Sequence, residues 1–348
     1  MAARLKILKA EHGDSIIASI SKGETLHHIV IDGGPSSKYA ENIVNEFKNL
    51  GGIDLMVLTH FDDDHIGGLI EYFKDYDGKE LPIQTCWVNC ASDISITDSS
   101  LVSYSQTRTL ENYLNGVSQR QRLEWKDAIV NTMEPVDLGF CKIKIVSPSP
   151  ESLRINHEEY IKKEGVATIS SASGRVKLDE KVSLFELANR PDIRHTARQD
   201  VINKSSIAFI LETESSKILL MGDADPWIVL DKLKELGYSK ENPLTIDYWK
   251  MSHHGSRNNI CKDLLDVIHC SNYIFSTNGG TGSAYHPDRE TLAKILCHQG
   301  RHEDDEVNFY FNYSLSEIQK RTGTLITDEE KEQYRCHTFC NVFDFSLP

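Results

Sequence analysis

The chain has 348 residues, of which 39% are hydrophobic and 26% charged, a composition typical of a globular protein with a sizeable buried core. Its 52 acidic and 38 basic side chains give a net charge of −14. An acidic surface repels phosphate backbones, so this charge disfavours binding of long nucleic acids. The N-terminus lacks the pattern of a signal peptide and no apolar run approaches the roughly 18 residues of a membrane span, so we expect a cytoplasmic protein without membrane contact.

Hydrophobic periodicity predicts two groups of strands separated by helices. In the first part, it predicts strands at residues 4–10, 15–20, 27–32 and 53–59 and helices at 38–50 and 64–76. The more polar middle predicts helices at 109–131, 151–164 and 180–189 and a strand at 142–147. The remainder predicts strands at 205–213, 217–223, 244–252, 272–277, 307–313 and 336–345, and helices at 226–237, 260–269 and 288–298. This order favours an α/β fold with two sheets covered by helices.

The division into domains follows from the same pattern. Residues 1–348 contain no low-complexity linker or internal repeat, so we expect a single domain. The polar and irregular character of about 92–200 favours an insertion there, and about 300–348 favours a C-terminal extension.

The motif THFDDDHIGG, residues 59–68, carries four candidate metal ligands between a buried strand and a helix. His60 and Asp62 are two apart in extended chain, so their side chains point the same way. Asp64 and His65 begin the helix. Capping of the helix by the acidic residues is the alternative interpretation, but it does not explain the two flanking histidines.

Two later motifs supply further ligands at the ends of other strands. MGDAD, residues 221–225, places Asp223 directly after an apolar strand, and MSHHGS, residues 251–256, places His253 and His254 after another. Acidic and histidine side chains that meet at strand ends form a common type of metal site. The sequence therefore predicts one or two divalent ions, and it leaves open which of the two adjacent histidines is the ligand.

These motifs, with HGDS (12–15), IDGG (31–34), NKSSIAFIL (203–211) and YHP (285–287), carry a family resemblance. The chain resembles the metallo-β-lactamase superfamily and, within it, the soluble metal-binding domain of the ComEC competence protein. The resemblance implies a four-layer αββα sandwich with the metals at one edge. It also implies that one metal is bound by His60 and Asp62, that a second is bound by Asp64, His65 and one histidine of the HHGS pair, and that Asp223 bridges both.

The chain departs from the usual superfamily pattern at two positions. Asp62 stands where a histidine is usual, and Asn203 lies near the place of another histidine. The first metal therefore lacks an obvious third ligand. A donor set richer in oxygen weakens the preference for zinc and favours harder ions such as manganese, so both metals are expected candidates.

The predicted function is that of a hydrolase that uses a metal-activated water. Asp64 or Asp223 would orient or deprotonate this water, and the resemblance places His286 beside the site, where it would contact a phosphate or protonate the leaving group. Asn203, Ser256 and Asn278 are further candidates for substrate contact, and Asp14 and Asp32 are expected to orient metal ligands.

The resemblance favours a phosphodiesterase or nuclease acting on a nucleotide or single-stranded nucleic acid. Two alternatives stay open: a hydrolase of small esters, lactones or thioesters, and a non-catalytic binding module. The sequence indicates no specific protein partner. At His286, the alternative is a loop residue that only stabilises a turn.

Overall fold

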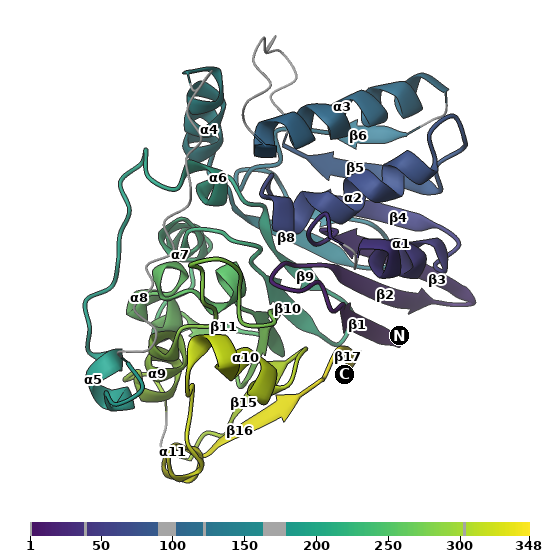
Figure 1. Ribbon diagram of the computed structural model, residues 1–348. Helices are drawn as coiled ribbons and strands as arrows, with labels where there is room; N and C mark the ends of the chain where they lie inside the picture. Colours follow the sequence, from purple (N-terminus) through teal and green to yellow (C-terminus); the bar gives the residue numbers. More distant parts are fainter. Residues whose placement is uncertain (1, 38–39, 90–101, 121–122, 163–178, 302–303) are drawn as a thin grey trace.

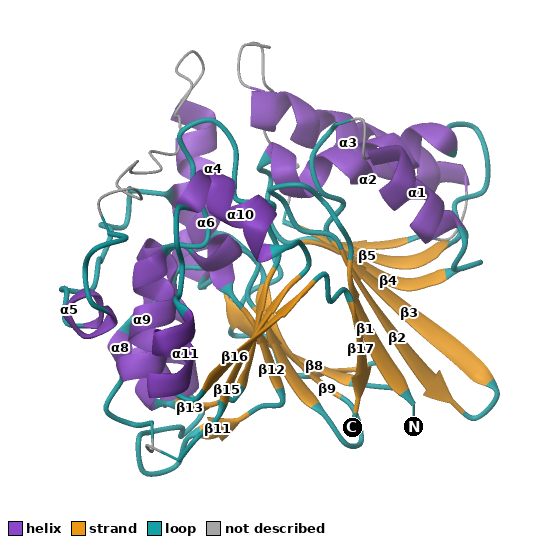
Figure 2. Cartoon of the chain, turned by 60° about the horizontal axis from the view of Figure 1, so that its bottom comes forward, coloured by secondary structure: helices purple, strands orange, loops and turns teal. Residues whose placement is uncertain are grey.

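The structure is a computed structural model that describes residues 2–37, 40–89, 102–120, 123–162, 179–301 and 304–348, and most of its strands form two large sheets (Figure 2). Sheet A has the order β17–β1–β2–β3–β4–β5–β6, with β17 (Asp344–Leu347), β1 (Ala3–Ile7), β2 (Ile16–Lys22), β3 (Thr25–Ile31), β4 (Ile53–Leu58), β5 (Ile83–Val88) and β6 (Glu124–Lys126). The pairs from β3 to β6 are parallel, and those from β17 to β3 are antiparallel. Because β17 pairs with β1, both ends of the chain lie at the same edge (Figure 1).

Sheet B contains most strands of the second half of the chain and two from its middle. Its order is β16–β15–β14–β12–β10–β9–β8–β7, with β16 (Cys336–Cys340), β15 (Val307–Phe311), β14 (Asn272–Phe275), β12 (Tyr248–Lys250), β10 (Lys217–Leu220), β9 (Ala208–Glu212), β8 (Lys142–Ser147) and β7 (Val136–Asp137). Strands β10, β12, β14, β15 and β16 are parallel neighbours, so their carboxyl ends meet at one edge. A separate small sheet pairs β11 (Leu244–Thr245) with β13 (Ile268–His269).

Side chains that alternate along the strands form the core between the two sheets. Leu55 and Val57 of β4 belong to one buried cluster with Phe209 and Leu211 of β9. Met56, which lies between the two β4 residues, points the other way and packs under helices. This period of two is what the strand geometry requires of a sheet that is covered on both faces.

Helices cover the outer face of each sheet and complete four layers (Figures 1 and 2). Sheet A is covered by α1 (Ala40–Lys48), α2 (Asp63–Asp75) and α3 (Val102–Arg120). Sheet B is covered by α5 (Leu184–Ala188), α7 (Pro226–Glu235), α8 (Lys262–Asp266), α9 (Arg289–Cys297) and α10 (Leu315–Thr322). The predicted αββα sandwich is thereby confirmed. Other helices are α4 (Pro150–Lys162), α6 (Val201–Lys204) and α11 (Asp328–Gln333), and no described helix is long and apolar enough to cross a membrane.

Several predicted boundaries were wrong for identifiable reasons. The helix predicted at 109–131 is α3, which begins earlier, and residues 124–126 are instead the edge strand β6, because pairing with β5 overrides local helical propensity. The strand predicted at 336–345 is two strands in different sheets, separated at Asn341, whose φ of 55° turns the chain. The helix predicted at 180–189 begins only at Leu184, after Ser183 caps it.

The polar middle of the chain contributes to both halves of the sandwich. Strand β8 pairs along β9 within sheet B, and α3 packs on α2 over sheet A. These stretches belong to the sandwich itself. The boundaries of an insertion at about 92–200 and of an extension at about 300–348 stay predictions, and residues 92–101 and 163–178 lie outside the described part of the chain.

The inter-sheet core predicts a large difference between two leucine truncations in sheet A. Leu55 is 0% exposed and Leu26 is 53% exposed. Leu55→Ala removes buried methyl groups and leaves a cavity, so we expect it to lower the free energy of unfolding by about 2–5 kcal/mol. Leu26→Ala, the matched control, should change it by less than about 0.5 kcal/mol. Chemical denaturation measures both, and equal losses would contradict the burial of β4.

Candidate metal centre

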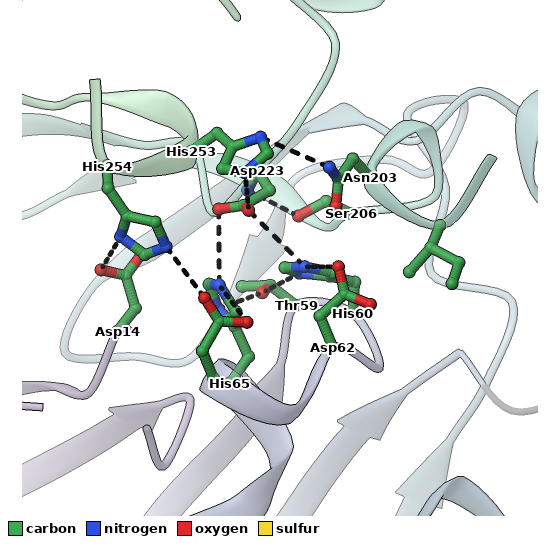
Figure 3. A network of polar contacts seen from close by, with 12 residues as sticks. Asp14, Thr59, His60, Asp62, His65, Asn203, Ser206, Asp223, His253 and His254 are labelled. Carbon is green, nitrogen blue, oxygen red and sulfur yellow. Dashed lines mark hydrogen bonds and ion pairs between the residues drawn. The ribbon is translucent and has the colours of Figure 1, made fainter. Parts of the chain in front are cut away.

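The predicted ligands lie at one edge of the sandwich, where strands of both sheets end. Residues 59–65 follow β4 of sheet A. Asp223 follows β10 of sheet B, and His253 and His254 follow the neighbouring parallel strand β12. The two sheets therefore each deliver part of the candidate ligand set to one network of polar side chains, called the pocket below and shown in Figure 3.

The loop from sheet A is fixed by close packing at the start of α2. Asp62 is the N-cap residue, and the backbone N–H of His65 donates to its carbonyl oxygen at 2.9 Å. A Cβ added to Gly67 or Gly68 would lie 2.1 Å or 2.0 Å from backbone atoms of residues 33–36. Glycine is therefore required for the helix to approach this segment, and the approach determines where the ligand loop lies.

The two adjacent histidines of sheet B have left-handed backbone conformations. Their φ angles are 47° for His253 and 55° for His254, and Gly255 follows with a φ of 91°. Side chains of adjacent residues in a strand point to opposite sides, whereas this turn lets both imidazoles reach one pocket. Left-handed backbone costs a residue with a Cβ about 1–2 kcal/mol, so the surrounding contacts must hold it in place. One such contact is donated by Nδ1 of His254 to the carbonyl oxygen of Ser276 at 2.9 Å.

The carboxylate of Asp223 lies in the middle of three imidazole rings (Figure 3). Its Oδ2 is 3.7 Å from Nε2 of His60 and 3.6 Å from Nε2 of His253. Its Oδ1 is 3.4 Å from Nε2 of His65. The two oxygens thus face two different sets of histidines, which is the arrangement expected of a ligand shared between two ions.

The candidate ligands divide into two groups around Asp223. The His254 half-site contains Asp64, His65 and His254, with Nε2 of His254 3.3 Å and Nε2 of His65 4.0 Å from the Asp64 carboxylate. The His253 half-site contains His60, Asp62 and His253, with Nε2 of His60 3.6 Å from Asp62. Both adjacent histidines therefore lie at the candidate site, His253 beside Asp223 and His254 beside Asp64. His253 is thus a candidate for the third ligand of the half-site that contains His60 and Asp62.

The unpaired atoms of the pocket fit a bound cation. Nε2 of His60, His65 and His254 and Oδ1 of Asp223 are buried and have no hydrogen-bond partner among the described residues. Ligand atoms about 2.0–2.2 Å from a tetrahedral ion lie about 3.3–3.6 Å from one another, close to the spacings found here. Imidazole nitrogens and carboxylate oxygens are ligands for zinc and manganese. The cluster is consistent with one or two divalent ions.

Buried acids lie behind two of the histidines. Asp32 accepts from the backbone N–H and hydroxyl of Thr59, both at 2.7 Å, and lies 2.7 Å from Nδ1 of His65. Asp14 lies 3.5 Å from Nδ1 of His254. These contacts orient the rings so that Nε2 of each faces the pocket.

Lys250 is a residue of this site that sequence reasoning missed. It lies in β12, is fully buried, and forms an ion pair with Asp14, which is also buried. A buried lysine requires a charged partner, because an isolated ammonium group is costly to remove from water. The signal was present in the apolar run DYWKM, where a lysine indicates a nearby buried acid.

The electrostatics of the site keep Asp64 and Asp223 ionised and make His65 and His254 more basic. Burial raises the pKa of Asp64 and of Asp223, but neighbouring histidines outweigh it and hold both pKa values below the usual range. Burial lowers the pKa of His65, but Asp223, Asp32 and Asp64 together raise it well above its usual value. Likewise, burial lowers the pKa of His254, but the nearby carboxylates, Asp14 foremost, raise it to about 9.

The three polar residues predicted to contact substrate have different surroundings. The buried amide of Asn203 lies 3.4 Å from Nδ1 of His253. The hydroxyl of Ser256 accepts from the backbone N–H two residues later at 3.3 Å and so caps the short helix η3 (Arg257–Asn259). The side chain of Asn278 accepts from the N–H two residues later at 3.2 Å and stabilises a glycine-rich turn. Of the three, Asn203 directly contacts a candidate ligand.

His286 lies beside the pocket at the end of the same glycine-rich loop. Its ring centre is 5.1 Å from that of His253, and neither ring nitrogen has a hydrogen-bond partner among the described residues. Nδ1 is 3.6 Å from the carboxylate of Asp288. Burial lowers the pKa of His286, which favours a neutral ring at physiological pH.

Comparison with known proteins supports the fold. The family model described as the metallo-beta-lactamase superfamily matches residues 24–86, which contain β3, β4 and the THFDDDHIGG motif. A comparison with curated protein sequences gives no significant match. Together with the two mixed sheets and their helical layers, the matched segment identifies the architecture as a metallo-β-lactamase fold.

Remote structural likenesses span almost the whole chain. The metallo-beta-lactamase fold protein YhfI from Bacillus subtilis is 9% identical, with a TM-score of 0.44 over 99% of this chain and 100% of that one. A diphosphatase from the PhnP family is 10% identical, with a TM-score of 0.43 over 99% and 98%. Zn(2+)-bound PqqB from Methylobacterium extorquens is 9% identical, with a TM-score of 0.44 over 99% and 100%. These likenesses are too distant to transfer a substrate to this chain.

The raised pKa of His254 predicts that metal binding releases protons. Because the pKa of His254 is about 9, the ring is protonated at neutral pH, and a metal must displace the proton on Nε2 to bind there. Affinity for zinc should therefore fall as the pH is lowered from 8 to 6, and about one proton or more should be released per ion at pH 7. Calorimetry in two buffers with different ionisation enthalpies measures the release, and a binding heat independent of the buffer would contradict the prediction.

Proposed function

We propose that the chain is a metal-dependent hydrolase that cleaves phosphodiesters with water activated beside Asp223. The observation that carries the proposal is the convergence of four imidazoles and three carboxylates at one place, where Nε2 of His60, His65 and His254 and Oδ1 of Asp223 have no hydrogen-bond partner among the described residues. Unpaired buried polar atoms are costly, so a pocket that gathers several of them indicates a ligand. Divalent ions in this pocket would lower the pKa of a bound water and stabilise negative charge on the reacting oxygens.

The acids of the pocket have separate proposed roles. Both oxygens of Asp223 face histidines and its side chain is 2% exposed, so we assign it to holding the ions rather than to proton transfer. The side chain of Asp64 is 22% exposed and can reach a water. Because its pKa lies well below the usual range, Asp64 stays ionised and orients the water by accepting a hydrogen bond.

His286 is proposed to bind the phosphoryl group. A neutral imidazole with both nitrogens unpaired can donate one hydrogen bond to a phosphoryl oxygen, and it lies next to His253. An approaching phosphate raises the pKa of this ring, so His286 can also supply a proton to the leaving group.

The preferred substrate class follows from the donor set and from the sequence resemblance. Three carboxylates beside four imidazoles favour manganese as well as zinc, and manganese supports phosphodiester cleavage. The similarity of THFDDDHIGG and MSHHGS to the soluble domain of ComEC supports a nucleotide or single-stranded nucleic acid. The net charge of −14 favours a short substrate over a long duplex.

A generic phosphodiester, bis(4-nitrophenyl) phosphate, tests the reaction class with manganese or zinc added. We expect turnover by the wild type and a loss of at least about 100-fold in Asp64→Ala, because the water loses its orienting carboxylate. Asp231→Ala, on the exposed side of α7, is the matched control and should keep full activity. Equal activity of wild type and Asp64→Ala would refute the proposed role of Asp64.

The rival functions are distinguished with the same preparations. Cleavage of a lactone, thioester or carboxylic ester without any cleavage of the phosphodiester would favour the ester-hydrolase alternative. Stoichiometric metal binding without any hydrolysis would favour a binding module. Metal content is measured by elemental analysis in each case.

Replacing His286 separates substrate binding from metal binding. His286→Ala should lower kcat/KM about 10–100-fold, since a hydrogen bond to a charged group contributes about 1.5–3 kcal/mol. Its metal content should equal that of the wild type. His286→Gln, which keeps a donor, should recover part of the loss, and His269→Ala, on the exposed strand β13, should show none. Loss of metal from His286→Ala would show that the ring has another role.

A further inference from the structure

We propose that the two half-sites bind metal unequally, so that the His254 half-site takes the first ion and the His253 half-site takes a second ion more weakly. The inference rests on the proposed metal-dependent function and concerns the order of loading. Three features of the pocket support it: the convergence of the ligand atoms, the groups behind each histidine, and the exposure of the side chains.

The ligand atoms of the His254 half-site already converge. One atom each from Asp64, His65 and His254 lies within 4.8 Å of the others. Within the described parts of the chain, no such trio includes Asp62 or His253. An ion in the His253 half-site must therefore draw its ligands together, and the ordering of side chains costs binding free energy.

The ligand atoms around His60 also favour binding of the first ion in the His254 half-site. The trio that includes it joins His60 to His65 and Asp223, and His65 is a ligand of the other half-site. Once an ion in the His254 half-site occupies His65, this trio loses one member. The His253 half-site then depends on Asp62 and His253, neither of which belongs to a converging trio among the described residues.

Both histidines of the His254 half-site have a carboxylate behind them. Nδ1 of His65 lies 2.7 Å from Asp32. Nδ1 of His254 donates to the carbonyl oxygen of Ser276 and also lies 3.5 Å from the carboxylate of Asp14. A carboxylate behind a histidine makes the opposite nitrogen more basic and fixes the ring, and loss of such a partner typically lowers metal affinity about 10–100-fold. This half-site therefore has two groups that strengthen binding of a cation.

The histidines of the His253 half-site have only neutral groups behind them. Nδ1 of His60 is 3.1 Å from the hydroxyl of Thr59. Nδ1 of His253 is 3.4 Å from the amide of Asn203. Neither group adds negative charge, so these rings are weaker ligands than those of the His254 half-site.

Net charge and burial act in the same direction. Lys250 offsets the charge of Asp14, but Asp32 has no cationic lysine or arginine partner among the described ion pairs, so one extra buried negative charge remains behind the His254 half-site. Buried charges are weakly screened by salt. The acids of the two half-sites are similarly exposed, Asp64 at 22% and Asp62 at 27%. However, the side chain of His254 is 3% exposed and that of His253 is 22% exposed. His253 also adjoins His286. The weaker half-site is thus the one whose histidine is more open to solvent and to the proposed phosphoryl contact.

Titration of the metal-free full chain with Mn²⁺, and separately with Zn²⁺, tests the proposal by calorimetry and chelator competition. We expect two steps whose dissociation constants differ at least about tenfold. His253→Ala should keep the tight step and lose the weak one, and His254→Ala should lose the tight one. Two equal steps in the wild type, or loss of the tight step in His253→Ala, would overturn the proposal.

Two reciprocal substitutions, Asp32→Asn and Asn203→Asp, test how the group behind each histidine ring affects metal affinity. Asp32→Asn should weaken the tight step about 10–100-fold and leave the weak step in place. Asn203→Asp should do the opposite and strengthen the weak step without changing the tight one. Because Asp32 also accepts from Thr59, its variant can lose stability, and in that case Asn203→Asp and His253→Ala decide the question. An Asn203→Asp variant that strengthens only the tight step would contradict the assignment.

The outcome is separable from that of the proposed reaction. Unequal two-step binding with no hydrolysis of any substrate keeps the order of loading and removes the hydrolase. Hydrolysis at saturating Mn²⁺ with two equal binding steps keeps the hydrolase and removes the order of loading. If both hold, activity should rise with the second step rather than the first.

Discussion

The buried carboxylate of Asp223 is the charge around which the metal centre and the junction of the two sheets are organised. Its backbone N–H donates to the hydroxyl of Ser206 at 3.0 Å, and its carbonyl oxygen accepts from Asn259 at 3.0 Å, so its position is fixed on the sheet B side. Burial of an unpaired carboxylate costs several kcal/mol. Imidazoles from both sheets, His60 and His65 from one and His253 from the other, surround it and offset that cost. A bound cation would satisfy all of these groups at once, which explains why the two halves of the sandwich meet through polar side chains here.

Much of this arrangement could be predicted because it depends on local patterns. Strands that are covered on both faces leave continuous apolar runs, such as residues 53–59, and those runs reveal the sheets. Acids and histidines placed directly after such runs reveal an edge with ligands, as in THFDDDHIGG and MGDAD. The two-sheet sandwich with its helical layers follows from these signals, and so does the gathering of acids and histidines at one edge. Helix ends are less predictable, because a cap such as Ser183 or a pairing such as β5 with β6 decides them.

What the sequence could not provide depends on backbone conformation and on distant contacts. Whether His253 or His254 faces the pocket cannot be read from a strand pattern, because consecutive left-handed residues bring both inward. The superfamily pattern points to the neighbourhood of Asn203 for a third ligand of the His253 half-site, whereas the structure places His253 beside Asp223 and Asn203 behind the His253 ring. Lys250 was overlooked for a related reason: its partner Asp14 is 236 residues away in the chain, so only the fold joins them.

Two segments near the C-terminus contact the glycine-rich loop that precedes His286 and fix its position. The N–H of Thr277 donates to the side chain of Asn312 at 3.0 Å, directly after β14 and β15 end side by side. Further along, Arg321 of α10 donates to two glycine carbonyls of the loop at 3.3 and 3.0 Å and lies 5.2 Å from the ring centre of Tyr285. These contacts fix a glycine-rich turn that otherwise has many accessible conformations, and His286 follows that turn directly. Residues 312–321 supply none of the candidate metal ligands, so their contribution is to hold the loop from which His286 reaches the pocket. Changes in this segment should therefore act on the proposed phosphoryl contact of His286 and leave the candidate metal ligands in place, so the two proposed roles depend on different parts of one fold.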